Sequence, residues 1–187
     1  NELIVAEKQA QLNDRLGSLK ELFGVLQQVA GDTKSVFEGS VISSELPGRE
    51  AFLTDLIRVA GATSELPSIE QLERLWFEMQ REATYSGRIA SYSADVVTPS
   101  GETTQQQVVR IGGFNAVSDG KYLNWDIESA RLIEMDKQPG ARYTDGITAL
   151  ESASGSELTG FWIDPSRGQL LKIMGQSPEL GDRVDQG

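Results

Sequence analysis

Residues 88–111 read RIASYSADVVTPSGETTQQQVVRI, and this stretch sets the fold class. β-Branched and aromatic side chains lie on both sides of Thr98-Pro99-Ser100-Gly101, whose proline and glycine are typical of a turn. The stretch therefore predicts a β-hairpin with strands over Arg88–Thr98 and Thr103–Phe114. Gly112-Gly113, near the end of the second strand, indicates a bulge or a close approach of another backbone segment.

The same alternation of turns and short apolar runs continues toward the C-terminus. In chain order it predicts a turn at Ser118–Lys121, strands over Tyr122–Asp126 and Arg131–Met135 with a turn at Glu128-Ser129 between them, a helix over Tyr143–Ala153, a strand over Leu158–Ile163 and a helix over Gln169–Met174. Consecutive hairpins of this kind predict an antiparallel meander.

Upstream of the hairpin the hydrophobic period is helical, and residues 1–38 predict one long helix. Two sets of apolar residues repeat every seven positions and interleave at spacings of four and three, as in the seam of a coiled coil. We expect this seam to associate with another copy or with a partner through Leu12, Leu16, Leu19, Phe23 and Leu26. The alternative is an ordinary amphipathic helix that docks on its own domain.

Two further helices are predicted before the hairpin. The first covers Arg49–Ala60, and the second follows Ser68, which forms a capping box with Gln71 three residues later and ends at Gly87. Large apolar side chains are usually buried, so we expect one face of this second helix to lie in the core. That face carries Ile69, Leu72, Leu75, Trp76, Met79 and Ala83.

A run of helices followed by a run of strands defines an α+β fold. The predicted layout is a helical, partly coiled-coil-like region over residues 1–86 and an antiparallel β-meander domain with short C-terminal helices over residues 87–176. Residues 177–187 are expected to form a membrane-proximal tail.

The composition excludes several classes of chemistry. The 187 residues include no histidine and no cysteine, which removes His-based triads, thiol nucleophiles and the usual zinc and iron–sulfur ligands. Seventeen basic and 28 acidic residues give a net charge of −11, which speaks against nucleic-acid binding. No run of 18 or more apolar residues occurs, so the sequence predicts no membrane-spanning helix within the chain.

Paired carboxylates, as in glycosidases, are the main catalytic option that remains. The acids in predicted loops are Asp119, Asp126, Asp136, Asp145 and Asp164. A chain with 28 acidic residues contains carboxylate pairs by chance, so we rank a carboxylate hydrolase below the two functions described at the end of this subsection. We expect no catalytic residue, no cofactor and no metal site.

Two loops are weaker candidates for contacts. Residues 164–168, Asp-Pro-Ser-Arg-Gly, predict either an anion site at a helix N-terminus or a capped turn from a strand into a helix. The turn formed by Ser118, Asp119, Gly120 and Lys121 is a candidate partner contact.

Several segments together resemble a known family. They are LGSLKELFGVLQQVAGDT at 16–33, LPSIE at 66–70, LWFEMQRE at 75–82, VSDGKYL at 117–123 and DPSRG at 164–168. These segments are similar to the large periplasmic N-terminal region of TtpC-type proteins, which are ExbB-like members of the MotA/TolQ/ExbB proton-channel family. The resemblance extends over nearly the whole chain.

The resemblance implies a periplasmic domain of an inner-membrane protein in a Gram-negative bacterium, with ExbB, ExbD and TonB as partners. Such systems use the proton-motive force to take up iron–siderophore or haem. The chain would be a piece of a larger protein that continues into membrane helices, where the family's proton-pathway residues lie, so none of those residues is transferred to this sequence.

The resemblance thus favours a non-enzymatic interaction domain of a TonB-system energising complex. The alternative function is a periplasmic module that binds a small ligand or a glycan. A pocket containing Trp125 or Trp162 would favour this alternative.

Overall fold

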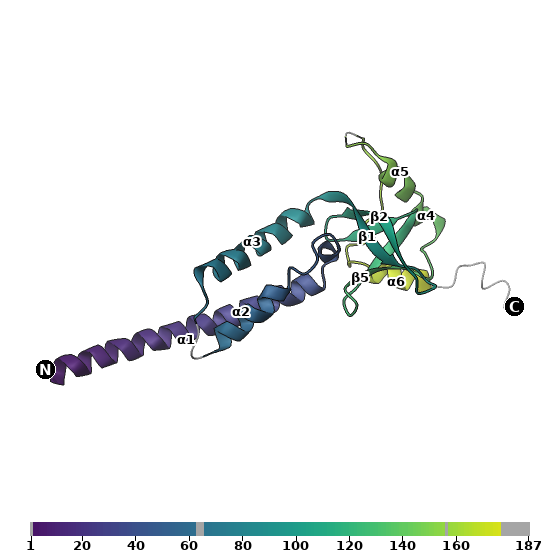
Figure 1. Ribbon diagram of the computed structural model, residues 1–187. Helices are drawn as coiled ribbons and strands as arrows, with labels where there is room; N and C mark the ends of the chain where they lie inside the picture. The colour runs from purple at the N-terminus through teal and green to yellow at the C-terminus, as the bar shows by residue number, and fades with distance from the viewer. Residues whose placement is uncertain (1, 63–65, 156, 177–187) are drawn as a thin grey trace. The chain divides into compact units, whose positions relative to one another are not determined.

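The computed structural model describes residues 2–62, 66–155 and 157–176, and the chain forms two compact units (Figure 1). The helical unit comprises residues 1–36 and 49–79, and the barrel unit comprises residues 37–48 and 80–187. Helices precede a β-rich region that is followed by short helices, so the predicted α+β class is confirmed. The compact units divide at residue 79, before the change of secondary structure at residue 86.

All three predicted N-terminal helices are present: α1 at Glu2–Glu38, α2 at Ala51–Gly61 and α3 at Ile69–Ser86. The capping box that starts α3 is formed as expected. The Ser68 N–H donates to Gln71 Oε1 at 2.9 Å, and the Gln71 N–H donates to Ser68 Oγ at 3.2 Å. The sequence signal at this helix start is therefore confirmed.

Helices α1, α2 and α3 each contribute buried apolar residues to the helical unit. Its buried apolar residues are Ala30, Leu53, Leu56, Val59, Ala60 and Leu75. Contacts between α3 and α2 include a hydrogen bond from Gln71 Nε2 to Asp55 Oδ2 at 3.2 Å and the Arg74 guanidinium, which lies 4.4 Å from the centre of the Phe52 ring. These contacts fix which side of α3 faces α2.

Five strands form a closed barrel: β1 at Ile89–Val97, β2 at Thr103–Ile111, β3 at Asn115–Ser118, β4 at Lys121–Asp126 and β5 at Arg131–Glu134. Neighbours along the chain pair antiparallel, which confirms the meander. The barrel closes where β5 pairs parallel with β1, at Val96↔Leu132 and Val97↔Ile133. This closure was not predicted.

Two predicted elements, a strand and a helix, differ from the structure in extent. The expected strand Thr103–Phe114 ends at Ile111, because a turn there separates β2 from β3. The expected helix Tyr143–Ala153 is two short helices, α4 at Ala141–Thr144 and α5 at Ile147–Ser152. Gly146 separates them, and a β-carbon there would lie 2.5 Å from the Gly160 carbonyl oxygen.

The expected strand Leu158–Ile163 is absent from this described segment. The barrel closes between β1 and β5, and the segment lies outside it, where Phe161 packs at 5.6 Å from the ring of Tyr122. The final helix, α6 at Gln169–Gln176, is present as predicted. The expected tail from Ser177 lies outside the described residues.

The barrel has apolar layers on both faces of its central strands. The interior holds Val96, Val108, Ala116, Leu123 and Leu132, together with Val41 from the short 3-10 helix η1 at Val41–Ser44. The outer layer joins Val109, Ile111, Val117 and Tyr122 to Ile147 of α5 and Leu171 of α6. Figure 1 shows α5 and α6 on the outside of the strands. This double burial explains why the neighbouring residues Val108 and Val109 of β2 are both buried.

The close approach predicted at Gly112 is confirmed and gives a test of the fold. Gly112 has φ of 56°, and a β-carbon there would lie 2.5 Å from the carbonyl oxygen of Ser86. We expect Gly112→Ala to lower the free energy of unfolding by about 2 kcal/mol or more, because a left-handed backbone and a backbone clash add. Gly160→Ala is the control, since no atom lies within 4 Å of its added carbon. Equal urea midpoints for the two variants would contradict this account.

Candidate functional site

The predicted seam of α1 changes character along the helix. Leu19 is 40% exposed, Phe23 and Leu26 are half-buried, and Ala30 is fully buried in the core of the helical unit. The C-terminal part of the seam therefore packs within the chain, which fits the alternative of a helix docked on its own domain. Leu12 and Leu16 belong to the α1 backbone, but their side chains lie outside the described residues.

A second apolar stripe on α1, which the sequence analysis did not single out, is exposed. We call Leu22, Val25, Val29 and Val36 the α1 stripe, and each is exposed by a third or more. Their spacing of three, four and seven residues puts them on one side of the helix. The stripe therefore offers apolar surface along about four turns of α1.

The expectation that the apolar face of α3 lies in the core is wrong. Trp76 is 66% exposed, and Met79 is also exposed, whereas Leu75 is buried beside the buried Glu78. The physical reason lies in the contacts to α2. Arg74 stacks on Phe52, and these contacts turn the Leu75 and Glu78 side of α3 inward.

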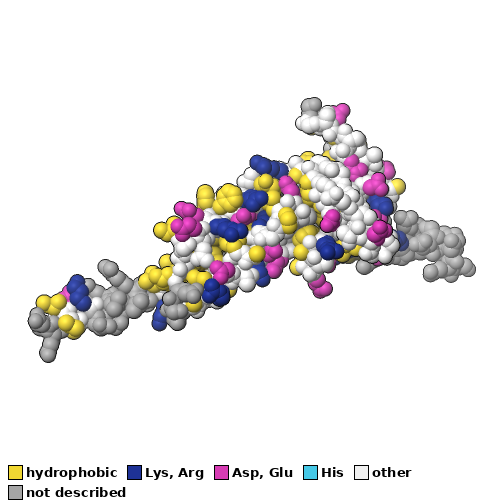
Figure 2. Space-filling view, in the orientation of Figure 1, with side chains coloured by type: hydrophobic (Ala, Val, Ile, Leu, Met, Phe, Trp, Pro, Cys, Tyr) yellow, Lys and Arg dark blue, Asp and Glu magenta, His cyan; other side chains and the backbone are white. Residues whose placement is uncertain are grey.

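The apolar face of α3 is therefore directed outward. We call Ile69, Leu72, Trp76 and Met79 the α3 stripe, and all four are exposed. Figure 2 shows hydrophobic side chains gathered along this helix. Large contiguous exposed apolar surface on a protein that is otherwise acidic marks a contact surface.

Most residues of the turn Ser118–Lys121 form hydrogen bonds to other residues of the barrel unit. Ser118 Oγ donates to the Gln107 carbonyl at 2.8 Å, and Lys121 Nζ donates to Glu134 Oε1 at 2.6 Å. The Gly120 N–H donates to Glu151 at 3.1 Å, while the side chain of Asp119 is exposed. Three of the four candidate residues thus contribute to internal structure.

Glu151 and Asp119 also line one open groove with Gln106 and Gln107. Burial raises the pKa of the Glu151 carboxyl, and the nearby charge of Asp119 raises it further, whereas the Gly120 N–H acts in the opposite direction. A raised pKa is one property of a catalytic acid. Here the carboxylate already serves as the acceptor that holds the turn at Gly120.

The segment Asp164–Gly168 forms a capped turn, and its own carboxylate takes the place of a bound anion. Asp164 Oδ1 accepts from the N–H and the hydroxyl of Ser166, at 2.7 and 2.5 Å. Oδ2 accepts from the N–H groups of Gly168 and Leu171, at 2.9 and 3.1 Å. Burial acts to raise the pKa of Asp164, but these hydrogen bonds outweigh it and lower the pKa.

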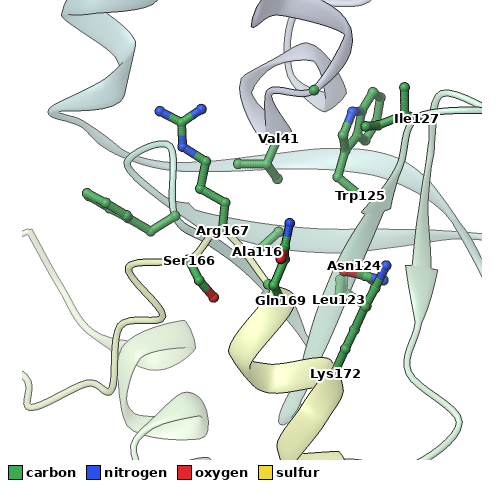
Figure 3. A pocket seen from close by; sticks show the side chains of 13 residues that line it. Val41, Ala116, Leu123, Asn124, Trp125, Ile127, Ser166, Arg167, Gln169 and Lys172 are labelled. Atoms are coloured by element: carbon green, nitrogen blue, oxygen red, sulfur yellow. The ribbon is translucent and has the colours of Figure 1, made fainter.

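Beside this turn lies a cavity of about 220 Å³ that contains Trp125 (Figure 3). Its walls come from β3, β4, the turn before α6, the start of α6 and the segment around Val41. Trp125 Nε1 donates to the Glu38 carbonyl at 2.7 Å, which fixes the indole. A pocket with Trp125 is the feature expected of the alternative, ligand-binding function.

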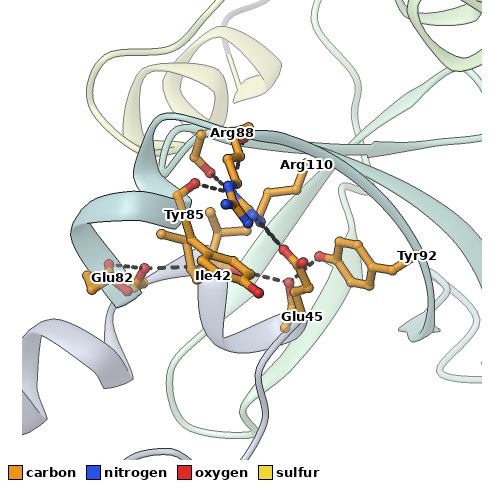
Figure 4. A network of polar contacts seen from close by, with 11 residues as sticks. Ile42, Glu45, Glu82, Tyr85, Arg88, Tyr92 and Arg110 are labelled. Carbon is orange, nitrogen blue, oxygen red and sulfur yellow. Dashed lines mark hydrogen bonds and ion pairs between the residues drawn. The ribbon is translucent and has the colours of Figure 1, made fainter. Parts of the chain in front are cut away.

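Arg110 is a buried residue that the sequence analysis missed. Its side chain is 0% exposed and donates to Glu45 Oε2 from Nε at 3.0 Å and from Nη2 at 2.5 Å. Nη1 donates to the carbonyls of Tyr85, at 3.1 Å, and Gly112 (Figure 4). The alternation of side chains along a strand could have revealed it. Residues 108 and 110 lie on the same face of β2, so Arg110 points inward with Val108.

The described residues contain no group of three or more acidic side chains able to hold a metal ion. None of their helices has the length and hydrophobicity needed to cross a bilayer. The chain matches no model of a protein family, no curated protein and no solved structure.

Proposed function

We propose that the protein is a non-enzymatic interaction domain whose helical unit binds a partner through the α3 stripe. The observation that carries this proposal is the outward direction of Leu72, Trp76 and Met79. An amphipathic helix normally buries such residues, and exposing them costs free energy that a partner recovers on binding. Trp76 is the expected anchor, because tryptophan is enriched among the residues that dominate interfaces.

The partner that fits this surface is an apolar helix. Residues at spacings of three, four and seven positions contact a partner helix along one line, and the α3 stripe has these spacings at Ile69, Leu72, Trp76 and Met79. The α1 stripe supplies a second surface of the same kind in the helical unit, and this surface also suits pairing with another copy.

The resemblance stated above suggests who the partners are. Most residues of the two stripes belong to segments that carry the resemblance, namely 16–33, 66–70 and 75–82. We therefore propose that the helical unit contacts ExbB, ExbD or TonB on the periplasmic side of an inner membrane, within a system that drives iron–siderophore or haem uptake.

The test places a photo-crosslinking amino acid at residue 72 in cells that contain the TonB-system proteins. The wild-type chain is expected to form a crosslink with one of them. Trp76→Asp combined with Met79→Asp should reduce the crosslink at least about 30-fold, because a tryptophan anchor contributes about 2 kcal/mol or more. Both side chains are exposed, so the helical content should not change.

The matched control is Ala51→Asp combined with Thr54→Asp, which adds the same charge at two exposed positions of α2. This control should crosslink like the wild type. A double variant of α3 that still crosslinks at the wild-type level would show that the α3 stripe is not the contact.

A further inference from the structure

We propose that the cavity beside Trp125 binds a small organic anion, with a carboxylate or phosphate group attached to a short apolar body. The site belongs to the barrel unit and does not depend on the function proposed for the helical unit. Three features of the cavity support this proposal: the positive charge of its lining, the hydrogen-bond donors of its cationic side chains, and its apolar walls.

The charge of the lining is the reverse of the charge of the chain. Arg167 and Lys172 line the cavity, and no aspartate or glutamate does, although the chain has 28 acidic and 17 basic residues. Within the described residues neither of these two side chains donates a hydrogen bond to another group, so both cations are available to a ligand. Figure 3 shows them on opposite sides of Gln169.

Two acids near the cavity, Asp164 and Asp126, are engaged elsewhere. Both oxygens of Asp164 accept hydrogen bonds from the turn beneath the cavity. The carboxylate of Asp126, which interacts with Lys172 through space, accepts from the N–H and the hydroxyl of Ser129 at 2.9 and 2.6 Å. An incoming anion therefore meets a guanidinium and an ammonium group that are not in close ion pairs.

The remaining walls suit a short apolar body. Val41, Ala116 and Leu123 form an apolar surface next to the indole of Trp125, which its hydrogen bond to the Glu38 carbonyl holds in place. The volume of about 220 Å³ lies below the range of roughly 300–1,000 Å³ typical of drug-sized ligands. Guanidinium groups bind carboxylates and phosphates through two parallel hydrogen bonds, which is the role we assign to Arg167.

The test follows the indole N–H signal of Trp125 by NMR during titration with benzoate and with phenyl phosphate. Both are expected to shift this signal saturably, with Kd of about 1 mM or lower, as fits a ligand of roughly ten non-hydrogen atoms. Benzamide lacks the charge and inorganic phosphate lacks the apolar body, and each should bind at least about tenfold more weakly. The ratio of the two anion affinities tells which anionic group the site prefers.

Arg167→Gln combined with Lys172→Gln should weaken benzoate and phenyl phosphate by about 100-fold, roughly tenfold for each lost charge. The control, Arg58→Gln combined with Arg142→Gln, removes the same charge from exposed positions outside the cavity and should bind like the wild type. Absence of a saturable shift in the wild type, equal binding of benzamide, or unchanged binding by the Arg167 and Lys172 variant would each overturn the proposal.

Discussion

Replacing Glu45 by alanine is expected to lower the free energy of unfolding of the barrel unit by about 3–5 kcal/mol. Arg110 is fully buried, and its guanidinium forms an ion pair with Glu45 at 2.5 Å. Without the carboxylate, the cation stays buried with carbonyl acceptors alone, and that loss is far larger than the loss of an exposed pair. The substitution should also release the residues after η1 from the barrel, since this pair joins positions 65 residues apart.

Glu45→Gln separates charge from hydrogen bonding at this position. Glutamine retains a hydrogen-bond acceptor but carries no charge. The free energy of unfolding of this variant should therefore lie between the values of the wild type and of Glu45→Ala. Lys121→Met is the control, because the ammonium group that it removes is 42% exposed whereas the Arg110 guanidinium is fully buried, so it should cost less than Glu45→Ala. Urea denaturation followed by the indole N–H signal of Trp125 in NMR spectra measures all three variants. Equal losses for Glu45→Ala and Lys121→Met would contradict the role of the buried pair.

Asp164→Asn is expected to destabilise the barrel unit by about 2–4 kcal/mol at neutral pH. The carboxylate accepts four hydrogen bonds, and each of its oxygens accepts at least one from a backbone N–H group. The NH₂ group of asparagine would therefore place a donor against a backbone N–H in either orientation. The substitution preserves the shape of the side chain, so the loss reports the hydrogen bonds and the charge.

The same variant has a defined pH signature. The pKa of Asp164 in the folded protein is lowered from its ordinary value of 3.8, so below about pH 4 the unfolded chain binds more protons than the folded one. The stability that the carboxylate contributes is therefore complete above this ordinary value and is lost as the pH falls through the lowered pKa. Denaturation at pH 7 and at pH 3 should give a smaller difference between wild type and Asp164→Asn at pH 3. A difference that stays constant would contradict the assignment.

The meander could be predicted because its signals are local. Pro99 and Gly101 mark the turn between β1 and β2, and Asp119-Gly120 forms the turn between β3 and β4 with φ values of 50° and 74°. The strand β3 was missed because Gly112-Gly113 and Phe114 continue an apolar run, and nothing local distinguishes a bulge from a turn between two strands. Closure of the barrel depends on the pairing of Val96 with Leu132, which lie far apart in sequence.

The direction of α3 could not be predicted for a related reason. Periodicity locates an apolar stripe on a helix, but it does not say whether the stripe faces its own core or a partner. The stacking of Arg74 on Phe52 and the burial of Glu78 determine which side of α3 faces inward. Both depend on contacts between helices and not on the sequence of α3 alone. The cavity was likewise only partly foreseen: Trp125 was a candidate, whereas Arg167 and Lys172 come together with it through the position of α6.

The way in which the barrel closes has a consequence for its motions. Strands β1 and β2 pair over nine residues, but β1 and β5 pair over two. Local opening of a protein begins where the fewest interactions must be broken, so transient opening of this barrel should start between β1 and β5 while the hairpin of β1 and β2 persists. Such an opening would bring water to Val96 and Leu132 in the interior, and hydrogen exchange would then be fastest along this one line of the sheet.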